Sequence, residues 1–266
     1  MVHRSEILHD THFGRHYLRH EPTGELTPYV SHVWKLTGYD LIPQGVAEHY
    51  LPRLEADLVF AFANRCLYRS AGRDLLAFSG PHVLPPQAKA LACLHPASRA
   101  VLGVSFRPGG QTALLGPSAE IQALPRLAAL ETELSHLSDF HSQAHRIESW
   151  LGERMRQTTV QPQLLTQALS CFNQGDSVAE AADAVGLSPR SLQRHCQQWL
   201  GLSPRTCRRV LRLRATLTRL WREPGYGLHD SGYHDYAHFF REFRSLTGLS
   251  PSAYLSQFEP AVPSGA

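Results

Sequence analysis

Four polar side chains with the chemistry to recognise base pairs recur at helical spacing in the C-terminal third of the chain. They stand at positions i, i+3, i+4 and i+7 of one segment: Arg190, Gln193, Arg194 and Gln197. One face of an α-helix presents all four side chains together. Arginine forms two hydrogen bonds with guanine, and glutamine forms two with adenine. The pattern therefore predicts a helix face that contacts base edges in the major groove of DNA.

The tetrapeptide Gly-Leu-Ser-Pro predicts the helices that position this face. It occurs at Gly186–Pro189, Gly201–Pro204 and Gly248–Pro251. Glycine ends a helix in the left-handed conformation, serine caps the next helix, and proline fits its first turn. We therefore expect helices that begin at Pro189, Pro204 and Pro251.

A short helix before the first junction completes a helix-turn-helix. Ser177 and Glu180 form a capping box, and the apolar residues that follow end at Gly186. The helix from Pro189 has its own apolar face, made of Leu192, Cys196, Trp199 and Leu200. Two short helices joined by a glycine turn, the second with an Arg/Gln face, are typical of this DNA-binding motif.

The second junction predicts a long helix from Pro204 to about Arg222. Its expected buried stripe comprises Val210, Leu213, Leu217, Leu220 and Trp221. A separate basic stripe suits DNA phosphates and comprises Arg205, Arg208, Arg209 and Arg212. Such a helix spans about 28 Å, close to the ~34 Å of one duplex turn, so it could place two recognition helices in successive major grooves.

A second unit repeats the spacing of the first. Phe239 and Arg241 correspond to Leu192 and Arg194. The later helix is expected to bury Phe239, Phe243 and Leu246. Its outer face is expected to present Ala237, Phe240, Arg241 and Arg244. This face is less polar than the first, which favours apolar contacts with thymine methyl groups.

The spacing of these motifs over about residues 161–257 resembles the AraC-type bacterial transcription regulators. The motif residues include Gly186, Ser188, Arg190, Leu192 and Arg194 in the first unit, and Gly232, Tyr233, Asp235, His238, Phe239, Arg241, Phe243 and Tyr254 in the second. The resemblance implies base contacts by Arg190, Gln193 and Arg194 in the first recognition helix. It implies the same for Tyr236, Ala237, Phe240 and Arg241 in the second, and contact with RNA polymerase by family analogy.

One stretch departs from the family pattern. Members usually carry an apolar helix just before the second turn, whereas residues 223–231 here include a proline and two glycines and are about three residues short. Proline and glycine both oppose a helix. We therefore expect a frayed or displaced first helix in the second unit.

The N-terminal part has a different pattern, and the predicted fold class is α+β. Short apolar runs separated by Pro and Gly turns predict an antiparallel β barrel or sandwich. The runs are Tyr29–Leu36, Leu58–Phe62, Leu75–Phe78, Lys89–Leu94 and Ala100–Phe106. We expect a β-rich sensor-like domain over 1–118, a helical connector over 119–160 whose main helix is capped by Ser138, a DNA-binding domain over 161–258 and a flexible tail over 259–266.

This N-terminal part weakly resembles the sensor-like domain of one AraC branch. That resemblance implies a cupin-like fold that binds a small-molecule effector, forms a homodimer, or does both. The residues that could line its interior are Trp34, His49, Arg53, Phe60, Phe62 and His82. An equally good interpretation makes them ordinary core and rim residues.

Charge is distributed unevenly along the chain. From residue 161 onward there are eleven arginines and eight acidic residues, an excess of three that equals the net charge of +3 for the whole chain. A neutral N-terminal part and a basic C-terminal part fit a sensor joined to a nucleic-acid-binding domain.

Several other classes of protein are disfavoured. No apolar run is long enough to span a membrane and no signal peptide is evident, so we expect a cytoplasmic protein. The five cysteines form no Cys-x-x-Cys pair, and neither a catalytic serine elbow nor a phosphate loop is present, so no enzyme and no cofactor are expected. His12, His16 and His20 would share a face only if helical, and no metal site is expected there.

The sequence thus predicts a transcription regulator that binds double-stranded promoter DNA and is controlled by a ligand or by self-association. The alternative is an effector-binding or interaction protein whose DNA binding is impaired by a degenerate second helix-turn-helix. The effector, the operator and the sign of regulation are open at this point.

Overall fold

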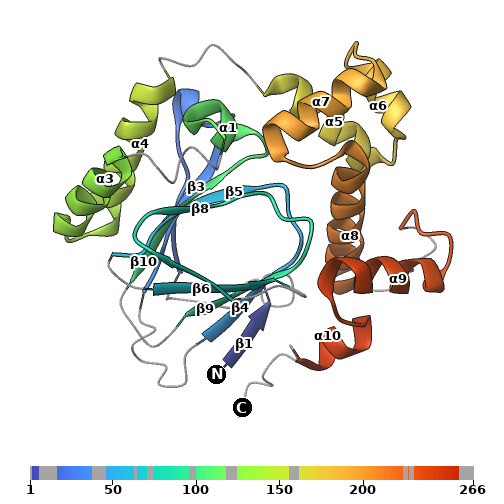
Figure 1. Cartoon of the computed structure of the whole chain (residues 1–266), viewed down its shortest axis with the longest axis horizontal. Helices are drawn as coiled ribbons and strands as arrows, with labels where there is room; N and C mark the ends of the chain where they lie inside the picture. Colours follow the sequence, from blue (N-terminus) through green and yellow to red (C-terminus); the bar gives the residue numbers. More distant parts are fainter. Residues whose placement is uncertain are drawn as a thin grey trace.

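The structure is a computed structural model that describes residues 2–5, 17–37, 46–62, 65–70, 75–95, 100–117, 125–155, 162–223, 227 and 231–257. Two β-sheets with covering helices form the N-terminal part, and the described C-terminal part is helical (Figure 1). This arrangement confirms the predicted α+β class.

Ten strands make two five-stranded sheets. The strands are β1 (Val2–Ser5), β2 (Tyr17–His20), β3 (Val30–Leu36), β4 (Val46–Tyr50), β5 (Ala56–Phe60), β6 (Arg65–Ser70), β7 (Leu75–Ser79), β8 (His82–Leu84), β9 (Leu91–His95) and β10 (Val101–Phe106). Their orders are β1-β4-β9-β6-β7 and β2-β3-β10-β5-β8, and each described pair is antiparallel except β1 with β4. The sheets face each other without joining into a closed barrel, so the predicted barrel or sandwich is realised in its open form (Figure 1).

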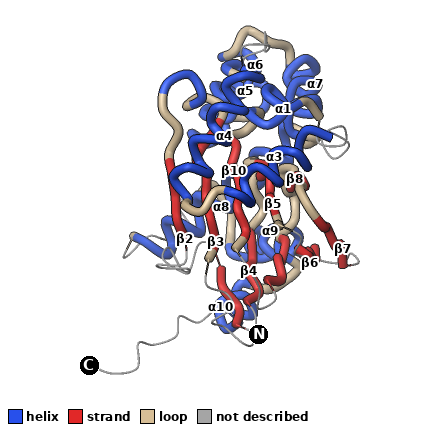
Figure 2. The backbone as a smooth tube through the Cα atoms, turned by 90° about the vertical axis from the view of Figure 1, so that its left-hand side faces the viewer, coloured by secondary structure: helices blue, strands red, loops and turns tan. Residues whose placement is uncertain are grey.

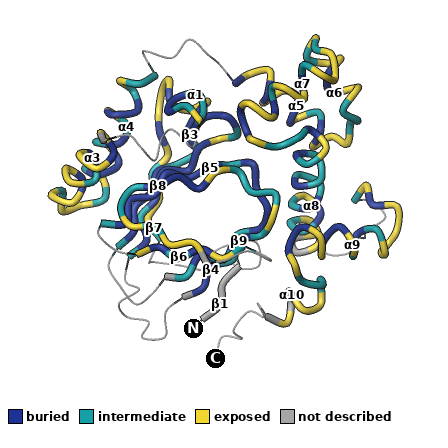
Figure 3. The backbone as a smooth tube through the Cα atoms, viewed as in Figure 1, coloured by how far each residue is buried: buried dark blue, intermediate teal, exposed yellow. Residues whose placement is uncertain are grey.

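The strands β5 and β10 of the second sheet are buried on both faces. Every residue of β5 and of β10 is buried (Figure 3). Val59 packs toward the other sheet with Trp34, whereas its neighbours Leu58 and Phe60 pack on the opposite side, because successive strand residues point to opposite faces. The helices on that opposite side are α1 (Gly110–Leu115), α3 (Pro125–His136) and α4 (Phe140–Met155), near the short 3₁₀ turn η2 (Gly24–Leu26). Burial on both faces explains why these strands have continuous apolar runs.

The sequence located the most apolar elements. A strand occurs in each of the five predicted runs, and a helix follows Ser138 as expected. Asp139, not Ser138, caps α4, since its Oδ1 accepts a hydrogen bond from the backbone N–H of Ser142 at 2.9 Å. The shorter or more polar strands β1, β2, β4, β6 and β8 were not predicted.

Six helices form the described C-terminal part: α5 (Gln163–Gln174), α6 (Val178–Ala184), α7 (Pro189–Leu200), α8 (Pro204–Arg222), α9 (Tyr236–Thr247) and α10 (Pro251–Gln257). Helices α5, α6 and α7 lie together at one end of α8, and α9 and α10 lie at the other end (Figures 1 and 2). The long helix therefore separates two helical units.

The three Gly-Leu-Ser-Pro junctions are confirmed as helix boundaries. Each glycine has a positive φ, of 68°, 67° and 81° in chain order. Each serine Oγ then accepts a backbone N–H from three residues ahead, at 3.1, 3.2 and 3.1 Å, and the proline begins α7, α8 or α10. The repeated tetrapeptide thus sets the ends of the helices.

The end of α8 and the stretch after it differ in part from the prediction. Leu220 is 39% exposed and is not part of the core. The stretch of residues 223–231, which departs from the family pattern, lies largely outside the described residues. Gly227 and residues 231–235 are described and are not helical. No first helix of the second unit is therefore seen in the described part of this stretch. The expected boundary between the connector and the DNA-binding domain, between residues 160 and 161, also lies outside the described residues.

The segment after β4 ties the sheets to both helical units. Leu51 is fully buried with Leu213 and Phe243, whereas Leu54 is buried with Trp199 and others of the first unit. Between them, the carbonyl oxygen of Pro52 accepts a hydrogen bond from Arg214 Nη1 at 3.3 Å. A few residues thus contact both ends of the C-terminal part.

Candidate nucleic-acid interface

The predicted base-reading face on α7 is exposed as expected. Leu192, Cys196, Trp199 and Leu200 are buried. Their burial directs the opposite side of the helix outward, and that side carries the exposed residues Arg190, Gln193, Arg194 and Gln197. In the described part of the chain, neither Arg190 nor Arg194 forms an ion pair or a side-chain hydrogen bond within the protein. Their guanidinium groups are therefore available to another molecule.

Helix α6 holds α7 in a helix-turn-helix. Ser177 and Glu180 form the predicted capping box, with the Glu180 carboxylate accepting the Ser177 N–H at 2.7 Å. The turn closes when the N–H of Leu187 donates to the carbonyl oxygen of Ala182 at 2.8 Å. Ala181 and Ala182 are buried beside Leu192. Small side chains at these positions let the two helices approach closely.

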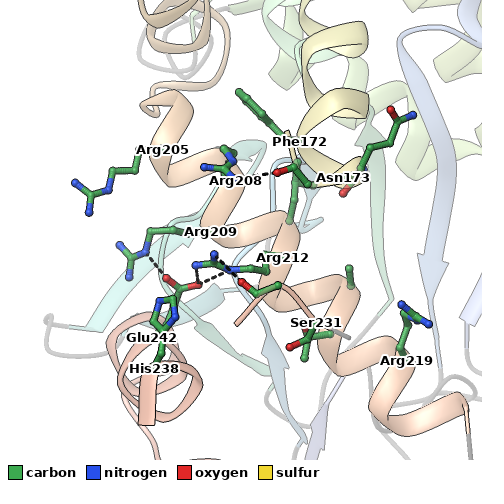
Figure 4. A pocket seen from close by; sticks show the side chains of 16 residues that line it. Phe172, Asn173, Arg205, Arg208, Arg209, Arg212, Arg219, Ser231, His238 and Glu242 are labelled. Atoms are coloured by element: carbon green, nitrogen blue, oxygen red, sulfur yellow. Dashed lines mark hydrogen bonds and ion pairs between the residues drawn. The ribbon is translucent and has the colours of Figure 1, made fainter. Parts of the chain in front are cut away.

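The basic stripe on α8 divides into two kinds of arginine. Arg205 is exposed and points away from the protein, whereas Arg208 Nη2 donates to the carbonyl oxygen of Gly175 at 3.1 Å (Figure 4). Arg209 and Arg212 turn toward α9, where both pair with Glu242. Together with residues of α5 and α9, the stripe lines a groove of about 660 Å³ (Figure 4).

Glu242 is the centre of this network. Its carboxylate accepts Arg209 Nε at 2.9 Å and Arg212 Nη2 at 2.7 Å. The hydroxyl of Tyr233 also donates to it, at 3.0 Å. Arg212 completes the cluster by lying 4.5 Å over the centre of the Tyr233 ring. Four polar groups from α8, α9 and the turn before α9 therefore satisfy one another.

The charge of Glu242 is stabilised in place. Burial opposes its ionisation, but the hydrogen bonds and charge of Arg212, followed by the hydrogen bond of Arg209, outweigh that effect and hold the pKa of the carboxyl below its ordinary value. Burial raises the pKa of the Tyr233 hydroxyl, and the charge of the same carboxylate raises this pKa further. Glu242 is thus an anion in the folded protein, with two cations beside it.

The outer face of α9 is more apolar than that of α7. Asp235 caps the helix, because its Oδ1 accepts the N–H of His238 at 2.6 Å. Phe239, Phe243 and Leu246 are buried as predicted. Tyr236 is 61% exposed, Phe240 is half-buried, and three further candidates are exposed: Ala237, Arg241 and Arg244. The face combines one exposed aromatic ring with two exposed arginines.

The two candidate faces lie at opposite ends of α8. Helices α7 and α9 both pack on α8, whose 19 residues separate them (Figure 1). A helix of that length spans about 28 Å.

The role of Glu242 was not foreseen. It is the one acidic residue of α9 and follows Phe239 by three positions, so it shares the buried face of the helix. A lone acidic residue on the buried face of a helix, in a domain with an arginine-rich helix, could have predicted this ion pair from the sequence.

The six candidates for an N-terminal pocket do not line a single space. Trp34 lies between the sheets, and the buried His82 accepts a hydrogen bond from Tyr68, which lies in the same cluster. Phe60 and Phe62 instead belong to the cluster under the helices, and Phe62 has a φ of 48°. His49 is half-buried on β4. The structure therefore separates the set into two layers.

The buried Arg53 belongs to a polar cluster that the sequence did not reveal. Arg53 pairs with Asp57, and Ser105 Oγ donates to the other carboxylate oxygen of Asp57 at 2.6 Å. The guanidinium of Arg53 also lies 4.6 Å from the ring centre of Tyr50, whose hydroxyl donates to Glu48 at 2.6 Å. Buried charges and hydroxyls of this kind are rare in a purely structural core.

Two other predictions concern membranes and metals. Among the described helices, none combines the length and the hydropathy needed to cross a bilayer. His12 and His16 lie outside the described residues. His20 lies in strand β2, not on the helix that a three-histidine face would need.

Comparison with protein families gives two matches. Residues 181–257 match the model of a helix-turn-helix domain family. Residues 18–122 match the model of a family described as a domain of unknown function, DUF6597. The first match contains α7, α8 and α9, and the second contains most of both sheets.

Several solved structures are similar at low sequence identity. ToxT from Vibrio cholerae, in a crystal form of space group P21, is 8% identical, with a TM-score of 0.44 over 92% of this chain and 100% of that one. Wild-type ToxT with a bound unsaturated fatty acid is 11% identical, with a TM-score of 0.43 over 85% of this chain and 94% of that one. The AraC-like activator CuxR is 14% identical, with a TM-score of 0.26 over 77% and 88%. No curated protein matches the sequence significantly.

Removing the charge of Glu242 tests the network. We expect Glu242→Gln to lower the free energy of unfolding by about 2 kcal/mol, because hydrogen bonds to a charged group are lost and two arginines keep their charge without a counterion. Thermal and urea unfolding measure the change. The matched control is Glu223→Gln, since Glu223 is half-exposed and pairs with Arg219; this variant is expected to stay within about 0.5 kcal/mol of the wild type. Equal effects of the two substitutions would contradict the assigned role.

Proposed function

We propose that the chain is an AraC-type helix-turn-helix transcription regulator and that its helix α7 reads the bases of promoter DNA in the major groove. The observation that carries this proposal is the exposed face of Arg190, Gln193, Arg194 and Gln197, opposite a fully buried apolar face. Arginine and glutamine on one helix face provide the paired donors and acceptors that distinguish guanine and adenine. The activity that we propose is binding, not catalysis.

The phosphate contacts are proposed for the arginines of α8. Arg205 has no partner among the described residues and is the foremost candidate. Arg208 has free donors besides the one that binds Gly175. Arg209 and Arg212 keep a net charge of +1 with Glu242, so they still attract phosphate while holding α9. Such contacts fix orientation on the duplex and make binding dependent on salt.

Helix α9 is proposed as a second reader. Tyr236, Ala237 and Phe240 suit thymine methyl groups, and Arg241 and Arg244 suit bases or phosphates. The length of α8 supports the proposal, because about 28 Å approaches the ~34 Å between successive major grooves on one side of the duplex.

We propose three functional parts along the chain. Residues 1–118 form the sensor-like domain, 119–160 the connector and 161–258 the DNA-binding domain. The polar cluster of Arg53, Asp57 and Glu48 between the sheets supports a small-molecule effector, since such groups can bind a polar ligand. Self-association through the same domain is the other proposed means of control. Contact with RNA polymerase follows from family analogy.

Replacing one arginine tests the first recognition helix. We expect Arg194→Ala to weaken binding to the cognate promoter site by about 5- to 150-fold, which corresponds to about 1–3 kcal/mol, and to relax preference at one base pair. Fluorescence anisotropy against single-base variants of the site measures both effects. The matched control is Arg65→Ala on β6, an exposed arginine of the other part. Wild-type affinity and preference in Arg194→Ala would refute the assigned face.

A second arginine tests whether α9 docks. Arg241→Ala is expected to lower affinity at least about fivefold at a full site and to have no effect on a half-site that binds α7 alone. The same anisotropy assay applies, with both DNA lengths. If the full site were bound as tightly as by the wild type, the chain would read DNA through one unit. A full-length wild type whose binding showed no steep salt dependence would instead favour an interaction protein without specific DNA binding.

Native mass spectrometry tests whether the N-terminal part controls DNA binding by self-association or by binding a small molecule. The chain alone has a mass of 29.7 kDa. We expect the purified protein to show either twice this mass, from self-association, or the single mass with a bound small molecule that is lost on denaturation. A bare monomer, both free and on DNA, would contradict both modes of control.

A further inference from the structure

Three histidines and one glutamate meet where strand β2 packs against helix α4. His20 is the last residue of β2, whereas His141, His145 and Glu148 lie at successive turns of α4. The ring centres of His20 and His145 are 5.2 Å apart, and those of His141 and His145 are 4.2 Å apart. The three residues that α4 contributes lie outside both family matches.

Three donor atoms of this cluster have the spacing of metal ligands. His20 Nε2 lies 3.3 Å from Glu148 Oε1, and His145 Nδ1 lies 3.1 Å from Glu148 Oε2. One ligand atom from each of the three residues lies within 4.8 Å of the others. Ligands at 2.0–2.1 Å around a tetrahedral ion are about 3.3 Å from one another. A single ion therefore fits among these groups with small side-chain adjustments.

The environment of His20 is unusual for a structural histidine. Its Nε2 is buried and, within the described part of the chain, makes no hydrogen bond, although the Glu148 carboxylate is close. A buried polar atom normally has a partner. The side chains of His20 and Glu148 are only 20% and 16% exposed, but that of His145 is 54% exposed. The donor atoms thus face a shared, partly enclosed position that solvent reaches from the His145 side.

His141 is placed to support the third ligand. Its Nε2 lies 2.9 Å from His145 Nε2. When His145 binds an ion through Nδ1, its Nε2 carries the hydrogen and donates it to His141. A ligating histidine normally has such a partner for its other nitrogen, which fixes the ring and its tautomer.

We propose that His20, His145 and Glu148 bind a divalent transition-metal ion of the Zn²⁺ class, with His141 as the positioning residue. Two imidazole nitrogens and a carboxylate oxygen suit such an ion, and three protein ligands leave a fourth position for water. The bound ion would join edge strand β2 to α4, which covers the same sheet. The sequence predicted no metal site at His20, because His12, His16 and His20 would share a face only on a helix, and the partners of His20 on α4 lie more than a hundred residues away.

Cobalt is the direct probe of this site. The full chain is freed of metal with a chelator and titrated with Co²⁺, whose visible absorption band reports four-coordinate nitrogen and oxygen ligands. We expect one equivalent to bind to the wild type, with displacement by Zn²⁺. His145→Ala and Glu148→Gln are expected to weaken binding at least tenfold, and His141→Ala about tenfold or more. His136→Ala, at an exposed histidine of α3, serves as the matched control and should bind as the wild type.

Thermal unfolding provides a second readout that does not depend on colour. Zn²⁺ should raise the Tm of the wild type and of His136→Ala but not that of His145→Ala, since an ion that binds only the folded state stabilises it. His145 is half-exposed, so its replacement should leave the metal-free protein folded. The proposal is overturned if the wild type binds no Co²⁺, if the α4 variants bind as the wild type, or if a thiolate charge-transfer band shows that cysteines hold the metal.

Discussion

The arrangement of the two helix-turn-helix units depends on the buried carboxylate of Glu242. Helix α9 has only a short apolar face, and no helix is described in the part of the preceding stretch that the structure covers. Its buried side chains Phe239, Phe243 and Leu246 pack in one cluster with Leu213 of α8. The charged hydrogen bonds from Arg209 and Arg212 of α8 to Glu242, together with that from the hydroxyl of Tyr233, add to this packing. These bonds have strict geometry, so they fix the rotation of α9 as well as its contact with α8. The same arginines that a simple charge count assigns to DNA thus also form part of the framework.

The sheets and the helical units share one segment. Leu51 and Leu54 enter the two helical cores, while Arg53 between them pairs with Asp57 on the sheet side. Two further hydrogen bonds join the sheet part to the helical units. Thr112 Oγ1 donates to the carbonyl oxygen of Trp199 at 2.9 Å, and the N–H of Ala90 donates to the carbonyl oxygen of Leu246 at 2.9 Å. Arg53 therefore lies next to Leu54 and two residues after Leu51, which connects it to the cores that hold the candidate helices α7 and α9. This connection gives the proposed control of DNA binding a physical path.

Local signals were enough to predict the first helix-turn-helix. Caps, glycine turns and the 3.6-residue periodicity of α7 are all encoded within a few residues, and the structure has each of them. What escaped was encoded at a distance. Glu242 interacts across 33 residues with Arg209, and His20 meets α4 across more than 120 residues. The strands β2, β4 and β6 likewise escaped because their own residues carry little apolar pattern, and β4 and β6 both pair with β9, further along the chain. Leu220 was wrongly predicted to be buried, because it continues the apolar stripe of the helix beyond the point where the core ends.

We propose that one rigid unit, held by Glu242, presents α7 and α9 to one side of a duplex. Hydroxyl-radical footprinting of the full chain on its cognate promoter site tests it most directly. We expect two protected segments on the same face of the DNA, separated by about one helical turn of 10–10.5 base pairs, with the segment at the α9 end lost in Glu242→Gln. A single protected segment in the wild type, unchanged by that substitution, would contradict it.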